Sequence, residues 1–191
     1  EAYPLNPGMQ QDVDEFMNLA FDKLEGMVKD TSQARLPQRF FGGSFMNQII
    51  SQECPHISER EETFSAISLE VKGKRNMAEA FQGYIQGDLL AGDNKYECSQ
   101  CNKKVDAVKR VCLNRMPDTL LVSLKRFSFN FETLLREKVN TYFDFPHELD
   151  LWAYSRCGLA SVEGKTLQFN DEAEQRLLND RLHYRYRLVG I

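Results

Sequence analysis

The stretch Cys98-Ser-Gln-Cys101 decides how the fold is interpreted, because it pairs with a second short motif upstream, Ser51-Gln-Glu-Cys54-Pro-His56. Two CxxC knuckles separated in this way normally close a tetrahedral zinc site made of four thiolates. Three sulfurs remain in this chain, and Ser51 stands where the fourth is expected. The spacing predicts a structural zinc clip, with one ligand replaced, that ties together the tips of two hairpins.

The candidate metal ligands are Cys54, Cys98, Cys101 and His56. Serine binds zinc poorly because its hydroxyl stays protonated near neutral pH, whereas a cysteine thiolate is accessible. His56 or a water molecule would complete the site, or the site would be empty. We expect an occupied site, because free thiols at a loop tip are prone to oxidation. The zinc would be structural, since a closed site has no open position for substrate.

The composition is that of a globular protein with a sizeable core. Of the 191 residues, 42% are hydrophobic and 11% aromatic, which suits one or two compact units. No apolar run approaches the roughly 20 residues that cross a bilayer, and a net charge of −4 does not favour nucleic acid. The cysteine spacing favours a reducing compartment. We expect a cytoplasmic or nuclear protein that binds neither nucleic acid nor a membrane.

The most regular helical pattern covers residues 10–30, where apolar residues recur at steps of three and four. Asp12, Asp14 and Glu15 fall near the expected N-terminus of this helix. Carboxylates there interact favourably with the helix dipole and the free backbone N–H groups. Dipole compensation is therefore one explanation of these acidic residues, and binding of a basic partner is the other.

Strand-like patterns of β-branched and aromatic residues follow along the chain. The apolar density of residues 119–129 predicts a strand in the middle of a sheet. Residues 155–180 have a weaker pattern and are interpreted as a surface insertion between two strands. Short helices are expected after the N-cap candidate Asn76 and over residues 171–178. The expected strands cover residues 40–50, 62–71, 104–116, 119–129, 138–145 and 184–191.

None of the cysteines or histidines has the sequence setting of a thiol-protease nucleophile or base. Such chemistry needs a Cys of lowered pKa with a His within hydrogen-bond reach. Cys112 falls inside an expected strand and is interpreted as a core residue. Cys157 is interpreted as an inert surface thiol, and His147 and His183 as ordinary loop or strand residues.

Several segments together resemble the catalytic domain of the ubiquitin-specific proteases, the papain-like deubiquitinases. Their order and spacing match over nearly all of residues 9–155 and again over 184–191. The matching segments are Gln10-Gln-Asp-Val-Asp-Glu-Phe16, similar to the QQDxxEF box; the two knuckles, similar to the fingers; Leu124-Lys-Arg-Phe127, similar to the LxRF box; Phe143-Asp-Phe-Pro146 with Leu149-Asp-Leu151; and Tyr186-Arg-Leu-Val-Gly190, similar to the strand before the catalytic His.

The resemblance implies an α+β, papain-like fold of which this chain is a fragment, with an antiparallel fingers and palm sheet and an N-terminal helix. Residues 1–39 would form a helical segment on the thumb side, residues 40–118 the fingers with the knuckles, and residues 119–191 the palm strands with an insertion at 155–181. The first residue is not Met, and residues 184–191 resemble a strand cut off while still paired. We therefore expect a piece of a larger protein.

The resemblance also implies that fingers and palm cradle ubiquitin, so that the partners are ubiquitin and ubiquitinated proteins. Asp12 and Glu15 match family positions that receive basic residues of the ubiquitin C-terminal tail. Gln10 and Gln11 match glutamines beside the active-site cleft. The implied activity is thiol-dependent hydrolysis of ubiquitin isopeptide and peptide bonds.

The chain departs from the family pattern at the catalytic residues as well as at Ser51. No box of the GNTCY type, which carries the family's nucleophile, occurs in residues 1–191. The family's His, and the Asp or Asn that orients it, come after the strand that ends this chain. We expect a chain that binds ubiquitin and is inactive alone. The alternatives are a non-catalytic ubiquitin-binding pseudoenzyme, and a zinc-ribbon interaction domain unrelated to ubiquitin, against which the first helix and Leu124-Lys-Arg-Phe127 argue.

Overall fold

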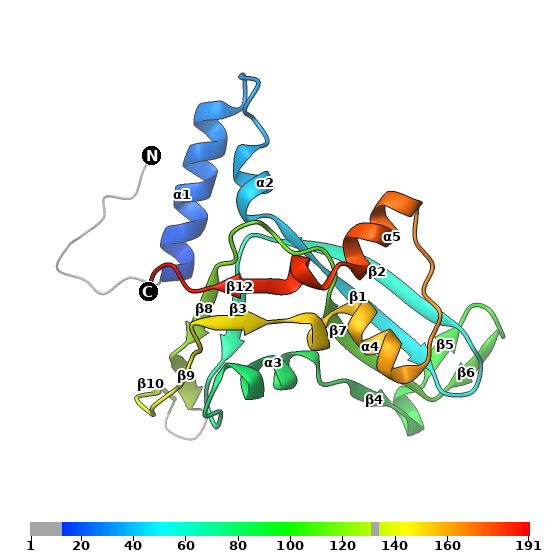
Figure 1. Cartoon of the computed structure of the whole chain (residues 1–191). Coiled ribbons are helices and arrows are strands. Elements are labelled where there is room, and N and C mark those ends of the chain that lie inside the picture. The colour runs from blue at the N-terminus through cyan, green and yellow to red at the C-terminus, as the bar shows by residue number, and fades with distance from the viewer. Residues whose placement is uncertain (1–12, 131–133) are drawn as a thin grey trace.

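The computed structural model describes residues 13–130 and 134–191 and has a mixed α+β architecture (Figure 1). The helices are α1 (Val13–Val28), α2 (Leu36–Phe41), α3 (Met77–Ile85), α4 (Arg156–Glu163) and α5 (Glu172–Asn179), with short 3-10 turns η1 (Gly92–Asn94), η2 (Trp152–Tyr154) and η3 (Arg181–Tyr184). The strands are β1 (Gly43–Ser51), β2 (Ile57–Phe64), β3 (Ile67–Glu70), β4 (Asp88–Leu90), β5 (Tyr96–Cys98), β6 (Lys103–Val105), β7 (Ala107–Leu113), β8 (Val122–Lys125), β9 (Phe127–Asn130), β10 (Leu135–Lys138), β11 (Glu148–Asp150) and β12 (Arg185–Arg187).

The largest sheet has the strand order β2-β1-β7-β4, and all its pairings are antiparallel. Strand β1 pairs along its length with β2, from Gly43 opposite Phe64 to Ile50 opposite Ile57. On its other side β1 pairs with β7. We call this sheet together with the β5–β6 hairpin the fingers. The expected antiparallel fingers sheet is confirmed.

A second group of elements, which we call the palm, consists of the parallel pair β3–β8, the antiparallel pair β11–β12, α3 and η2. Their side chains form the main hydrophobic core, which also takes in the end of β7 at Leu113. Phe81 of α3, Leu69 of β3 and Tyr184 are fully buried there. The Tyr184 hydroxyl donates a hydrogen bond to the Asn114 carbonyl oxygen at 2.8 Å. The core therefore joins the base of the fingers to the palm.

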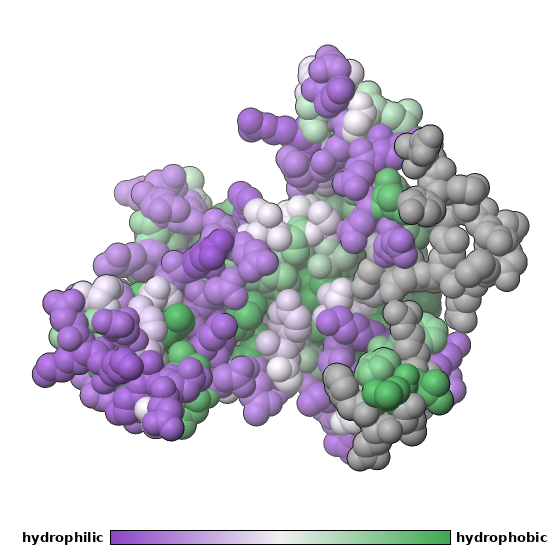
Figure 2. Space-filling model, turned by 180° about the vertical axis from the view of Figure 1, so that it is seen from behind, coloured by the Kyte–Doolittle hydropathy of each residue, from purple (hydrophilic) through white to green (hydrophobic). Residues whose placement is uncertain are grey.

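The two faces of the fingers sheet differ in burial. Along β1, Ser44, Met46, Gln48 and Ile50 are buried, whereas the alternate residues Phe45, Asn47 and Ile49 are half-buried. This period of two is the one that a strand imposes on its side chains. Helix α4 lies on the buried face, as its ion pairs with the sheet show. We call the opposite face the open face; it looks toward the viewer in Figure 2, where the middle of the molecule is recessed.

Helices α1 and α2 form an arm that stands away from the sheets (Figure 1). The rings of Phe21 and Phe41 lie 5.1 Å apart and connect the two helices. The expected helix over residues 10–30 is confirmed for residues 13–28; the residues before Val13 lie outside the described part. Among the described helices, none combines the length and apolar character needed to cross a bilayer.

Local signals for helix starts predict the structure well. Asn76 is the N-cap of α3, and its side chain accepts a hydrogen bond from the Glu79 N–H at 2.9 Å. Asp171 caps α5 in the same way, accepting from the Glu174 N–H at 2.8 Å. Both short helices are therefore confirmed, because a capping side chain acts within its own turn and needs no distant partner.

Several strand predictions are wrong in extent. The strand expected over residues 119–129 is replaced by two short strands, β8 and β9, that are interrupted at Arg126. Strand β8 pairs with β3 at the side of the core, and Phe127 is 54% exposed. A strand is expected over residues 138–145, but β10 ends at Lys138, the residue where that strand is expected to begin. The apolar side chains of Val139, Phe143 and Phe145 pack on the core instead. A loop that packs on the core removes these apolar side chains from water as a strand would, without backbone pairing to a neighbouring strand.

The prediction that residues 155–180 are a surface insertion is wrong for α4. Arg156, Cys157, Gly158 and Ala160 are all buried. Cys157 is therefore a buried thiol and not a surface one. The eight residues of α4 are too few to show a clear helical period, and the helix is stabilised by packing on the sheet more than by its own propensity.

Candidate functional site

The two knuckles meet at the tip of the fingers. The first is the turn between β1 and β2, and the second is the turn between β5 and β6. The Sγ atoms of Cys54, Cys98 and Cys101 all lie within 4.8 Å of one another, and Cys54 Sγ is 3.7 Å from Cys98 Sγ. Three converging thiols suit a metal that prefers sulfur ligands. The structure thus brings together the three cysteines that the sequence singled out.

His56 borders this three-cysteine cluster. Its Nδ1 atom lies 3.2 Å from Cys98 Sγ. A Cys and a His at this distance could also be a nucleophile and its base. Cys98 is fully buried, however, so a bulky protein substrate has no access to its sulfur. The arrangement fits a metal knuckle and excludes this pair as an open thiol-protease site.

Ser51 shapes the first knuckle through its hydroxyl. The Ser51 Oγ atom accepts hydrogen bonds from the backbone N–H groups of Glu53 at 3.2 Å and Cys54 at 3.1 Å. The Cys54 thiol donates to the same oxygen at 3.2 Å. Serine hydroxyls commonly hold turns in this way. The replacement at this position therefore keeps the turn closed by protein contacts alone.

The thiols of the cluster differ in acidity. The hydrogen bond with Ser51, followed by the backbone of His56, lowers the pKa of the Cys54 thiol. Hydrogen bonding with Cys98, followed by burial, raises the pKa of Cys101. A metal binds the thiolate form, so Cys54 gives up its proton more readily than Cys101 when a metal binds.

A polar bridge joins the two knuckles beside the thiols. The Asp106 N–H donates to Glu53 Oε1 at 3.0 Å, and the Gln52 N–H donates to the Asp106 carbonyl oxygen at 2.8 Å. Lys95 Nζ lies 3.0 Å from Asp106 Oδ1 and 3.5 Å from Glu53 Oε1. These contacts connect the β1–β2 turn with the junction of β6 and β7, so the cysteines converge through contacts that need no metal.

The other two cysteines are unsuited to nucleophilic chemistry. Cys112 is fully buried, and burial raises the pKa of its thiol to about 12. Burial likewise raises the pKa of Cys157. A nucleophilic cysteine needs the opposite shift, toward the thiolate. Cys112 is confirmed as a core residue, and Cys157 is inert because it is buried.

His183 stabilises the fold through a hydrogen bond to the backbone. Its Nε2 atom accepts a hydrogen bond from the Met116 N–H at 3.1 Å. Burial lowers the pKa of its ring, which favours the neutral form that can accept this bond. His147 is exposed and its backbone carbonyl accepts from the Leu188 N–H. Neither histidine is placed beside a reactive thiol.

Of the four residues predicted to contact ubiquitin, the structure describes only Glu15. It lies in the first turn of α1 with its side chain exposed. Gln10, Gln11 and Asp12 lie outside the described residues. The role of these four residues stays a prediction.

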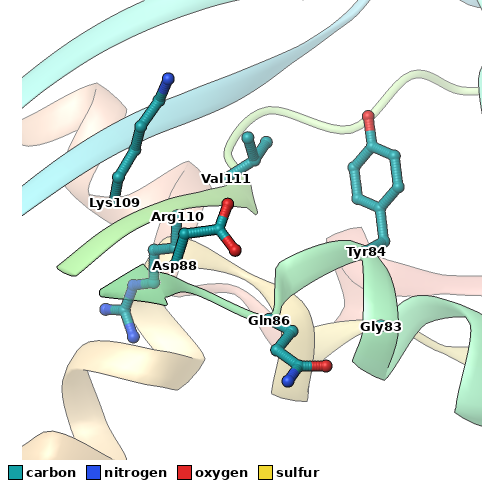
Figure 3. A pocket seen from close by; sticks show the side chains of 7 residues that line it. All are labelled: Gly83, Tyr84, Gln86, Asp88, Lys109, Arg110 and Val111. Atoms are coloured by element: carbon teal, nitrogen blue, oxygen red, sulfur yellow. The ribbon is translucent and has the colours of Figure 1, made fainter. Parts of the chain in front are cut away.

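The open face of the fingers carries a mixed surface that sequence analysis did not identify. Strand pairing places Asn47 between Arg60 and Val111, and Ile49 between Ser58 and Lys109. A shallow depression of about 500 Å³ adjoins this surface where α3 meets β4 and β7. Figure 3 shows Tyr84, Lys109 and Val111 on one side of β7 and Arg110 turned toward the other. The lining residues are Gly83, Tyr84, Gln86, Asp88, Lys109, Arg110 and Val111.

The depression is polar and open, unlike the enclosed, mostly apolar pockets that hold small molecules. Protein–protein interfaces combine an apolar centre with a polar rim, and this surface likewise has half-buried apolar residues beside charged ones. The alternation of Lys109 and Val111 with Arg110 along one strand was the available sequence signal. It could not be interpreted without knowing which side of β7 is covered.

Comparison with known proteins gives a consistent picture. The family model described as ubiquitin carboxyl-terminal hydrolase matches residues 1–191. The chain is 37% identical over 195 residues to ubiquitin carboxyl-terminal hydrolase 9X of Mus musculus, covering 98% of this chain and 8% of that protein. It is 34% identical over 191 residues to ubiquitin carboxyl-terminal hydrolase 34 of Homo sapiens, covering 100% of this chain and 5% of that protein. The chain thus spans less than a tenth of the length of these relatives.

Solved structures match the fold as well. One is a SAGA DUB module of Ubp8, Sgf11, Sus1 and Sgf73 bound to monoubiquitin, with a TM-score of 0.69 and 26% identity; the match covers 77% of this chain and 34% of that one. A second structure of this module, bound to ubiquitin aldehyde, matches with a TM-score of 0.68 and 23% identity, covering 85% of this chain and 35% of that one.

The Ser51 hydroxyl generates a prediction for the first knuckle. Replacing Ser51 by Ala leaves the N–H groups of Glu53 and Cys54 without their acceptor, which costs about 1 kcal/mol. We expect amide hydrogen exchange at Glu53 and Cys54 to speed up by about fivefold. Ser161→Ala, an exposed serine on α4, is the matched control and should leave both rates unchanged. Equal exchange rates in the Ser51 variant and the unaltered protein would show that this hydroxyl does not hold the turn.

Proposed function

The chain belongs to the ubiquitin carboxyl-terminal hydrolase family, and from this membership we propose that it forms the ubiquitin-binding fingers and palm of a thiol-dependent deubiquitinase. The substrates would be ubiquitinated proteins, cleaved at isopeptide or peptide bonds to ubiquitin. The catalytic groups would come from other parts of a longer protein. The 191-residue chain alone would be inactive.

The observation that carries this proposal is the open face of the fingers. It combines charged residues such as Arg60 and Lys109 with half-buried apolar ones such as Ile49, and it lies opposite the face that α4 covers. Figure 2 shows a recess in the middle of the molecule on this side. A solved structure with a similar fold, at 26% identity, is bound to monoubiquitin. Both facts support ubiquitin as the occupant of the open face.

The chain's own part in the reaction is binding and orientation. All five cysteines are either in the three-cysteine cluster or buried with raised pKa values, so none is a suitable nucleophile. Contacts far from the scissile bond still aid the reaction, because they hold the substrate in the geometry that the reacting groups need. In this proposal the fingers supply that remote binding energy.

The chemical step follows the scheme of thiol hydrolases, carried by groups elsewhere in the longer protein. A thiolate attacks the carbonyl carbon of the last glycine of ubiquitin, forming a C–S bond. The C–N bond breaks, and the leaving amine takes its proton from the imidazolium of the paired histidine. Water then hydrolyses the thioester and releases the ubiquitin carboxylate and the free thiol.

The start of α1 is proposed to guide the ubiquitin tail toward that thiol. Glu15 is exposed in the first turn, next in the chain to the acidic residues Asp12 and Asp14. An exposed carboxylate at a helix start, such as that of Glu15, can pair with a basic residue of the tail. Gln10 and Gln11 would lie beside the cleft.

Zinc is the metal that we propose for the three-cysteine cluster. The donor set of Cys54, Cys98 and Cys101 suits it, and His56 is near enough to complete the site. The metal would hold the two finger tips together and would take no part in bond cleavage. We further propose a cytoplasmic or nuclear location, which the five free cysteines support.

A covalent trap distinguishes an active enzyme from a binding-only pseudoenzyme. We expect the complete parent protein to react with ubiquitin that carries a C-terminal electrophile, and the mass to increase by one ubiquitin. Peptide mapping should find the modified cysteine outside residues 1–191. The 191-residue chain should form no adduct. Binding of ubiquitin by the parent without any adduct would favour the pseudoenzyme, and an adduct on Cys54 or Cys98 would contradict the assignment of the cluster.

Charge reversal tests the start of α1. In the complete parent protein, Glu15→Lys and Asp12→Lys should each weaken ubiquitin binding by about tenfold, the loss expected for one charge-assisted hydrogen bond. For Glu15→Lys the loss of affinity should shrink at high salt, because the Glu15 side chain is exposed and salt screens exposed charges. Glu172→Lys on α5 is a matched control at an exposed glutamate. Affinities equal to that of the unaltered protein, measured by calorimetry, would remove these residues from the ubiquitin site.

Metal analysis tests the cluster. Purified protein should contain about one equivalent of zinc, and Cys98→Ser should lose it. Ser51→Cys adds a fourth thiol next to Cys54 and should tighten zinc binding in a chelator competition. Cys112→Ala is the control, because that cysteine lies outside the cluster. A zinc content of less than a few tenths of an equivalent would rule out an occupied site.

A further inference from the structure

Helix α4 is attached to the back of the fingers by a row of polar side chains. Glu59 of β2 and Arg110 of β7 both lie directly opposite Gln48 of the central strand β1. The three side chains therefore form one line across three strands, on the face that α4 covers. Arg156 at the first residue of α4 pairs with Glu59, and Glu163 at its last residue pairs with Arg110. We call these five residues the α4 clamp.

The spacing of the helix matches the spacing of the strands. Arg156 and Glu163 are seven residues apart, which is close to two turns, so they project from one side of α4. Seven residues of helix rise by about 10.5 Å. Two strand-to-strand steps span about 9.6 Å. Each end of α4 therefore reaches one outer strand of the row.

The contacts of the clamp are charge-assisted and continuous. Arg156 donates from Nε to Glu59 Oε1 at 2.9 Å and from Nη2 to Glu59 Oε2. Gln48 donates to Glu59 Oε1 at 2.6 Å and accepts from Arg110 Nε at 2.8 Å. Arg110 Nη2 donates to Glu163 Oε2 at 3.0 Å, and its Nη1 to Glu163 Oε1. A two-point pairing of this kind fixes angle as well as distance.

The clamp is shielded from water at the Arg156 end. Arg156 is 4% exposed, its Nη2 also donates to the Gln168 carbonyl oxygen at 2.8 Å, and its guanidinium lies 5.4 Å from the centre of the Phe169 ring. Burial would raise the pKa of Glu59, but the hydrogen bonds from Arg156 and Gln48 outweigh it and hold the pKa below its usual value. Both groups are therefore charged at neutral pH, and neither charge can be removed without leaving the other unpaired.

The same helix is fixed to the palm at its start. The Ser155 hydroxyl caps α4 by accepting from the Gly158 N–H at 2.9 Å, and it donates to the Trp152 carbonyl oxygen at 2.7 Å. A Cβ at Gly158 would collide with that carbonyl, so the helix packs against η2 at a point where only glycine fits. Ser155 also forms a β-bridge with Leu113 at the end of β7. Helix α4 is therefore held by η2 of the palm at Ser155 and Gly158, and by strands of the fingers at Ser155, Arg156 and Glu163.

We propose that the α4 clamp positions the fingers relative to the palm, and that Arg156 is a positioning residue for ubiquitin affinity. The inference rests on the proposed function, because it takes the open face as the ubiquitin site. The fingers contact the body of ubiquitin and not the scissile bond. Loosening the clamp therefore weakens binding of intact ubiquitin while the chemistry on the tail stays unchanged.

The test compares two substrates in the complete parent protein. One is a C-terminal fluorogenic amide of whole ubiquitin, and the other is the same amide of a short peptide from the ubiquitin tail. We expect Arg156→Met to raise KM for the ubiquitin substrate by about tenfold with kcat changed by less than about twofold, and to leave hydrolysis of the tail peptide unchanged. Arg156→Lys, which keeps the charge but loses the two-point pairing, should give a smaller rise in KM.

Two further variants complete the design. Arg176→Met removes an exposed ion pair on α5 and is the matched control, which should leave both substrates unaffected. The double variant Arg156→Met with Glu59→Gln removes the unpaired charge and should bind no worse than Arg156→Met alone, since the two residues act as one unit. Thermal unfolding of each variant reports whether it is folded, and Arg156→Lys keeps the test available if Arg156→Met does not fold.

The outcomes separate the two proposals. A parallel loss of activity on both substrates, or an unchanged KM for ubiquitin, would overturn the positioning role. A parent protein that cleaves neither substrate but binds ubiquitin would contradict the deubiquitinase proposal only; the dissociation constants of the same variants then decide the clamp, and equal values reject it. A parent protein that neither cleaves nor binds ubiquitin would reject both.

Discussion

Pairing of β1 on both of its edges is the constraint on which the rest of the structure depends. Its ladders with β2 and β7 fix the register of three strands at once. A shift by one residue would move every side chain to the other face. The register sends Gln48 to the face that α4 covers and Asn47 and Ile49 to the open face. It also places Ser51 at the end of the strand, where the first knuckle starts.

The two faces of the fingers sheet differ in what contacts their side chains. The covered face holds charged and polar side chains at buried positions, and such groups are tolerated in a protein interior only when they are paired. Helix α4 supplies both partners, Arg156 and Glu163, and so neutralises the row of Glu59, Gln48 and Arg110. In the proposed function, the open face is the surface that contacts ubiquitin. Helix α4, whose sequence shows little regular pattern, is thus needed to pair the charged side chains on the covered face of the fingers.

At the tip of the fingers, the contacts that shape the first knuckle differ from the thiols that could bind a metal. Ser51 closes the first turn with hydrogen bonds to Glu53 and Cys54, and Asp106 links that turn to the second hairpin. Three thiols then converge within 4.8 Å. A serine at position 51 offers no thiol to a metal, but its hydroxyl holds the turn because it accepts two backbone hydrogen bonds. Hydrogen bonds of the backbone and of Ser51 therefore set the shape of the knuckle, whereas the thiols set how well it could bind a metal.

Sequence by itself determined what depends on neighbours along the chain. It identified the family from the order of its motifs, the helix α1, the caps at Asn76 and Asp171, and the core position of Cys112. It misjudged Cys157 and the extent of several strands, and it did not reveal the α4 clamp. A cap or a period acts within a few residues, whereas Glu59, Arg110 and Arg156 meet only after distant strands pair in one register. Tertiary structure alone decided which face is covered, since that choice depends on what packs against the sheet.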